Sequence, residues 1–139
     1  GGLDEMGRRA HMYRKIGDAF IADDFAHEQS VVFETGKGLV IFNSCSHGGI
    51  VNIVREVQMA LGGQKVYAVV GGFHMMKLSG VDTLAIPEEE VVETAKELKA
   101  LGVEEIYTGH CTGNIAFGIL KKELGDMVHA LGTGETVDF

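Results

Sequence analysis

The chain has 139 residues and a formal net charge of −8 at pH 7. Nucleic acids and anionic membranes bind clustered lysine and arginine, so this acidic balance argues against both as partners. No apolar run reaches the roughly 20 residues that span a bilayer, and no signal-peptide pattern opens the chain. A chain of this length fits one globular domain. We therefore expect a cytoplasmic protein whose two cysteines are reduced.

Strand-like runs come first in the chain, after a polar and weakly periodic start. A short run covers 19–22, and longer runs cover 30–35 and 38–43. The two longer runs flank Gly36-Lys37, a turn dipeptide. This arrangement predicts a β-hairpin.

Helices and strands then alternate, judged from apolar spacing, glycine stops and proline. The predicted elements are a helix at 50–61, a strand at 65–70, a helix from Pro87 to Leu101, a strand at 105–108, a helix capped by Thr112, and one or two edge strands within 127–131 and 135–139. Such alternation predicts a largely parallel sheet with right-handed crossovers. The predicted fold class is therefore α/β, a β-hairpin followed by alternating α and β elements.

Histidine follows three of the predicted strands, each time in a loop rich in glycine or serine. These histidines are His47, His74 and His110. Parallel strands end at one edge of a sheet, where α/β proteins assemble their sites. One histidine after a strand is usually capped or solvated, but three equivalent occurrences favour a site. Converging imidazoles suit a divalent metal, with zinc first and iron or manganese as alternatives.

The two cysteines leave the ligand set open. Cys45 lies two residues before His47, and Cys111 directly follows His110. Their thiolates would complete a mixed zinc site, but the spacing matches no zinc-finger pattern. A small buried apolar role fits each cysteine better.

The other histidines rank lower as ligands. His27 lies in a polar stretch, where we expect it to pair with Asp24 or Glu28. His129 is expected to face solvent from an edge strand, and His11 belongs to the polar start of the chain.

Five motifs in order resemble the metallo-β-lactamase superfamily, and within it the hydrolase branch labelled dihydropterin–ribofuranosylaminobenzene-phosphate synthase-like. They are Asp23-Asp24-Phe25-x-His27-Glu28-Gln29, Lys37-Gly38-Leu39-Val40, Ser44-Cys45-Ser46-His47-x-Gly49-Ile50-Val51-Asn52, Gly71-Gly72-Phe73-His74 and Thr108-Gly109-His110-Cys111-Thr112-Gly113. The resemblance implies half of an αββα sandwich with a metal site at the sheet edge. His47 corresponds to the third metal motif of the family, and His110 to its last ligand histidine.

Two departures from the family limit what the resemblance implies. The bridging aspartate expected between those two motifs is absent, and His74 stands near its place. The principal motif of the N-terminal half, His-x-His-x-Asp-His, does not occur in the chain. We therefore interpret residues 18–139 as a C-terminal half and residues 1–17 as a polar N-terminal segment.

Two functions follow from this interpretation. The first is the C-terminal part of a metal-dependent hydrolase, whose metal-activated water attacks a phosphoester or ester-like bond of a small-molecule substrate. The second is a catalytically silent metal-binding or assembly module. Half a sandwich leaves an apolar sheet face, so we expect a homo-oligomer or pairing with a missing N-terminal half.

Overall fold

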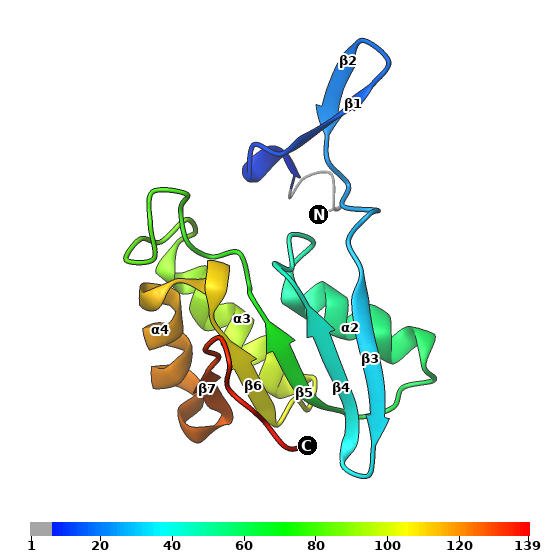
Figure 1. The fold of residues 1–139 in the computed structure, drawn as a ribbon, viewed down its shortest axis with the longest axis vertical. Coiled ribbons are helices and arrows are strands. Elements are labelled where there is room, and N and C mark those ends of the chain that lie inside the picture. The colour runs from blue at the N-terminus through cyan, green and yellow to red at the C-terminus, as the bar shows by residue number, and fades with distance from the viewer. Residues whose placement is uncertain (1–6) are drawn as a thin grey trace.

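A five-stranded sheet forms the centre of the computed structural model, which describes residues 7–139 (Figure 1). Its strands, in spatial order, are β3 (Ser30–Thr35), β4 (Gly38–Asn43), β5 (Val66–Gly71), β6 (Glu105–Thr108) and β7 (Val128–Ala130). β3 and β4 pair antiparallel, and every later pair is parallel. The predicted α/β class, hairpin and parallel sheet are confirmed.

Three helices cover one face of this sheet (Figure 1). They are α2 (Ile50–Ala60), α3 (Glu88–Ala100) and α4 (Asn114–Leu124). Each buries an apolar stripe against the strands, as Val54, Val91 and Leu120 show. Full burial of such a side chain contributes about 1.5–3 kcal/mol, so this layer is the main source of stability. No helix in the described part of the chain is both long and apolar enough to cross a membrane.

The opposite face of the sheet is partly covered by the C-terminal segment (Figure 1). Phe139 packs edge-on against Phe42 and Tyr107, with ring centroids 5.9 and 5.6 Å apart. Toward β3 the face stays open, and Val31 and Phe33 are 56% and 57% exposed. An apolar sheet face without a helical layer is therefore present, although the tail shields part of it.

A separate β-hairpin precedes the sheet and projects from it (Figure 1). It pairs β1 (Tyr13–Ile16) with β2 (Ala19–Ala22). The sequence does not predict β1, because Tyr-Arg-Lys-Ile shows no clear alternation. The boundary drawn at residue 17 falls in the turn of this hairpin. The start of the predicted polar segment, residues 1–6, lies outside the described residues.

One local prediction is wrong. Thr112 does not cap α4, which begins after Gly113 instead. The Thr112 hydroxyl is buried, where it accepts a hydrogen bond from the Phe73 N–H at 3.0 Å. The Thr112 hydroxyl, which the local sequence predicts as a helix cap, is thus used in a tertiary hydrogen bond. Of the one or two edge strands expected at the end of the chain, β7 forms, and residues 135–139 do not join the sheet.

Candidate functional site

The loops that follow β4, β5 and β6 meet at the carboxyl edge of the sheet. Hydrogen bonds join them: the Gly72 N–H donates to the Ser44 carbonyl at 2.8 Å, and the Met75 N–H donates to the Cys111 carbonyl at 2.9 Å. The buried Ser46 hydroxyl also donates to the Gly72 carbonyl at 2.6 Å. The loops that carry the three predicted histidines are therefore held against one another, as the parallel topology requires.

His47 and His74 lie together at this edge. Their ring centroids are 4.5 Å apart, and the ring planes cross at 75°. His74 has a left-handed backbone with φ of 50°. Such a conformation costs roughly 1–3 kcal/mol in a non-glycine residue and is concentrated at functional sites. Both histidines border a cavity of about 560 Å³, whose lining includes Asn52 and Met75.

Glu28 holds the His47 loop in place. Its carboxylate accepts hydrogen bonds from the backbone N–H groups of His47 at 2.7 Å and Gly48 at 3.0 Å. The carboxylate oxygen Oε1 also lies 3.3 Å from His47 Nδ1. The Glu28 side chain is only 9% exposed. This arrangement favours the tautomer with a proton on Nδ1, which leaves Nε2 of His47 free to bind a ligand.

Phe25 covers the His47 ring from the same segment. The two rings stack with centroids 5.5 Å apart. A turn places Phe25 there, because the Asp23 side chain accepts a hydrogen bond from the Phe25 N–H at 2.8 Å. The sequence-based pairing of His27 with Asp24 or Glu28 is wrong. His27 Nδ1 lies 3.8 Å from Asp23 Oδ1 instead, and Glu28 contacts His47.

His74 is held as a neutral base. Burial lowers its pKa below 6.5, and the neighbouring His47 lowers it further, whereas Glu28 acts in the opposite direction. A neutral imidazole keeps the lone pair that a metal requires.

The lowered pKa of His74 predicts a pH effect on folding. Below pH 6.5 the unfolded chain takes up a proton that the folded chain does not yet bind, so the unfolding free energy falls as the pH drops from 6.5 to the folded-state pKa and then levels off. Denaturant titrations between pH 7 and 5 should show this loss, and it should shrink in His74→Asn. An NMR titration that placed the His74 midpoint above 6.5 would contradict the prediction.

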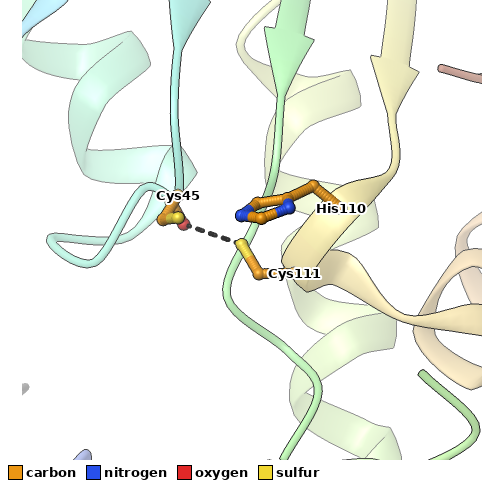
Figure 2. A group of neighbouring side chains, drawn as sticks. All are labelled: Cys45, His110 and Cys111. Carbon is orange, nitrogen blue, oxygen red and sulfur yellow. Dashed lines mark hydrogen bonds between the residues drawn. The ribbon is translucent and has the colours of Figure 1, made fainter. Parts of the chain in front are cut away.

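His110 lies in a different group of side chains. Its ring nitrogen and the sulfurs of Cys45 and Cys111 all lie within 4.8 Å of one another (Figure 2). Among residues 7–139 this is the one such group of three possible ligands, and it includes neither His47 nor His74. The structure therefore divides the predicted histidines into a pair, His47 and His74, and a third that stands with the cysteines.

Cys111 is buried at the centre of these loops. Burial raises the pKa of its thiol to about 12. We expect Cys111 in the metal-free, folded chain to react far more slowly with iodoacetamide at pH 8 than an exposed cysteine, because the thiolate is the nucleophile. Stability should also fall as the pH rises above 9, where the unfolded thiol ionises first. Peptide mass spectrometry after timed alkylation measures the reactivity of Cys111, and rapid labelling of this cysteine in the folded chain would refute the expected slow reaction.

The remaining histidines lie apart from both groups. The sequence predicts that His129 faces solvent, but in the structure its ring has partners on the sheet. Its Nε2 lies 2.6 Å from a Glu105 carboxylate oxygen, and its ring stacks on Tyr107 at 4.6 Å. The parallel pairing of β6 with β7 brings these residues together across the sheet. His11 is exposed in the N-terminal part of the chain.

Comparisons with known proteins bear on this arrangement. No protein-family model matches the sequence. The chain is 36% identical, over 128 residues, to 7,8-dihydropterin-6-methyl-4-(β-D-ribofuranosyl)-aminobenzene-5′-phosphate synthase of Methanocaldococcus jannaschii, covering 92% of the chain and 41% of that protein. It also matches the crystal structure of Tm1679, a metal-dependent hydrolase of the β-lactamase superfamily, with a TM-score of 0.79 and 30% identity.

The second match covers 91% of the chain and 46% of the hydrolase. The chain thus spans less than half the length of each of these two proteins. The resemblance seen in the sequence motifs is confirmed in sequence and in fold. The chain is therefore related to the metallo-β-lactamase superfamily, and it corresponds to about one half of a member.

Proposed function

We propose that this chain forms part of a metal-dependent hydrolase that acts on a phosphoester or ester-like bond of a small molecule. The observation that carries the proposal is the pairing of His47 with His74 at the sheet edge, beside a cavity of about 560 Å³. Two neighbouring imidazoles, one of them supported by the Glu28 carboxylate, offer nitrogen ligands of the kind that zinc, iron and manganese accept. When bound, such a metal activates water and polarises the bond to be cleaved.

The residues of the chain have distinct roles in this proposal. His47 and His74 supply imidazole nitrogens, while Glu28 fixes the orientation of the His47 ring. Phe25, itself buried, stacks on that ring and shields it in part from water. Met75, 4% exposed, contributes an apolar wall to the cavity. These residues bind and orient; the carboxylate that would position the attacking water is not among them.

We propose that a second half of the protein or a partner chain supplies that carboxylate and further ligands. The two related proteins are more than twice as long as the region they share with this chain. The open part of the sheet face, around Phe33, offers a surface on which such a half would pack. We place the activity in the cytoplasm, where thiols such as Cys45 and Cys111 stay reduced.

Metal binding and hydrolysis test the proposal together. The purified chain should bind zinc, iron or manganese, and the double variant His47→Asn/His74→Asn should lose that binding at the paired histidines. His27→Asn is a matched control, because this histidine is exposed and outside the pair. Hydrolysis of aryl phosphodiesters and aryl esters should appear once the complementary half is present. Failure of all three metals to bind the intact, folded chain would refute the proposal.

A catalytically silent assembly module is the second candidate. Its support is the exposure of Val31 and Phe33 on a sheet face that lacks a helical layer. Burying such a patch in a homodimer would remove apolar surface from water. Sedimentation at micromolar concentration tests this: we expect dimers, and fewer of them for Phe33→Glu. A stable monomer of the folded chain would contradict the module.

A further inference from the structure

We propose that three buried hydroxyl groups hold the loop of His74 in the shape that places its imidazole beside that of His47. The positioning residues that carry these hydroxyls are Ser46, Thr108 and Thr112. In the part of the chain that the structure describes, they are the buried residues with polar side chains, at 1%, 0% and 0% exposed. The inference rests on the proposed metal-binding role of the histidine pair, and it adds the residues that set the geometry of that pair.

The backbone just before His74 has little support of its own. Gly71 and Gly72 carry no side chains, and glycine has the greatest conformational freedom of all residues. A Cβ atom at Gly71 would lie 2.1 Å from the Asn43 carbonyl oxygen, and one at Gly72 would lie 2.6 Å from Cys111 Sγ. Close packing of the loops therefore requires glycine at both positions. Contacts from neighbouring loops must then hold this segment in one conformation.

Thr108 and Thr112 hold the segment from the β6 side. The Thr108 hydroxyl donates a hydrogen bond to the Gly71 carbonyl at 2.8 Å, and the Phe73 N–H donates to the Thr112 hydroxyl at 3.0 Å. The two hydroxyl oxygens lie 2.6 Å apart. Because Thr108 uses its one proton on Gly71, Thr112 donates the hydrogen bond between them. A continuous chain of hydrogen bonds thus runs from the Phe73 N–H through both hydroxyls to the Gly71 carbonyl.

Ser46 holds the same segment from the β4 side. Its hydroxyl donates to the Gly72 carbonyl at 2.6 Å. Ser46 directly precedes His47, so this hydrogen bond joins the loop of one histidine to the loop of the other. His74 has a left-handed backbone with φ of 50°. Such a conformation persists only where surrounding contacts over-determine the backbone, and the three hydroxyls provide those contacts on residues 71–73.

A role confined to stability explains this placement poorly. Burial of a hydroxyl has a desolvation cost that its hydrogen bonds largely offset, so the net gain is small. What a hydroxyl adds over a methyl group is direction, because it accepts from an N–H and donates to a carbonyl at defined angles. Groups in a binding site need positions fixed to within about 0.5 Å. Three directional contacts on the one loop that carries His74 meet that need.

Threonine-to-valine substitutions remove the hydroxyl and keep the shape of the side chain. In the metal-free wild-type chain, NOEs should connect the ring protons of His47 and His74, whose ring centroids are 4.5 Å apart. We expect Thr108→Val and Thr112→Val to lose most of this NOE intensity. Calorimetry should also show zinc affinity at the pair falling by about 10-fold or more. Thr112→Ser keeps the hydroxyl and should retain both properties.

Two control variants separate positioning from loss of stability. Leu124 is buried in α4 and takes no part in these hydrogen bonds, so Leu124→Ala should lower the free energy of unfolding and leave the ring NOEs unchanged. The Thr35 hydroxyl donates to the Gly38 carbonyl at 2.8 Å, in the turn at the other end of the β3–β4 hairpin. Thr35→Val should likewise leave the NOEs unchanged.

Several outcomes would overturn the positioning role. They are unchanged NOEs in both valine variants, an equal loss of NOEs in Leu124→Ala, and a Thr112→Ser chain that behaves like Thr112→Val. Thr108→Val decides the matter if Thr112→Val does not fold, because valine is favoured in strands and Thr108 ends β6. A wild-type chain that binds no metal would refute the hydrolase function, whereas the NOEs of the metal-free chain would still decide the role of the hydroxyls.

Discussion

Replacing Glu28 by glutamine is expected to weaken metal binding at His47 by about 10- to 100-fold while the chain still folds. The carboxylate contacts His47 Nδ1 and accepts two backbone hydrogen bonds from the same loop. Glutamine keeps the size of the side chain, but it presents an NH₂ group to one of those donors and removes the negative charge. The His47 ring then loses the partner that fixes its tautomer and orientation.

Two measurements distinguish this positioning role from a purely structural one. Long-range ¹H–¹⁵N NMR of the metal-free chain should show His47 mainly with a proton on Nδ1, and a mixture of tautomers in Glu28→Gln. Zinc titration by calorimetry gives the loss of affinity. Glu93→Gln, an exposed substitution on α3, serves as the matched control. An unchanged tautomer and unchanged affinity in Glu28→Gln would show that Glu28 only stabilises the loop.

The position of Glu28 shows what local sequence patterns miss. Pattern reading pairs an acidic residue with its neighbours, here His27. The actual contact, with His47, spans 19 residues and follows from the register of the β3–β4 hairpin. In that register Ser30 lies opposite Asn43, so the residues just before β3 run beside the residues just after β4. The hairpin is predictable from the sequence, and so is its register from the short turn. That register therefore places Glu28 beside the loop of His47.

The larger elements are predictable because their signals are local. Apolar spacing in α2 and α3 and the turn between β3 and β4 each depend on a few adjacent residues. The meeting of three loops at one edge follows from the parallel order. The grouping of His110 with Cys45 and Cys111 does not follow from this order. It depends on left-handed backbones at His74 and His110 and on contacts between loops, none of which short sequence windows encode.

Gly71→Ala is expected to destabilise the chain by about 3 kcal/mol. Gly71 has a φ of 147°, and a Cβ atom there would lie 2.1 Å from the Asn43 carbonyl oxygen at the end of β4. The obstructing atom is backbone within a central strand, so it has no easy way to move. Denaturant unfolding measures the loss. Gly118→Ala is the matched control, because Gly118 lies in a helix with open space around it. Alanine there should raise the free energy of unfolding by about 0.5–1 kcal/mol.

The same substitution tests whether the pairing of His47 with His74 depends on the close packing of the two strand ends. Relief of the clash requires the ends of β4 and β5 to separate, which moves the His47 loop away from the His74 loop. At a temperature where Gly71→Ala is still folded, its zinc affinity at the histidine pair should therefore be lower than that of the wild type. Equal stability of Gly71→Ala and wild type would mean that the strand ends are not packed as closely as this argument requires.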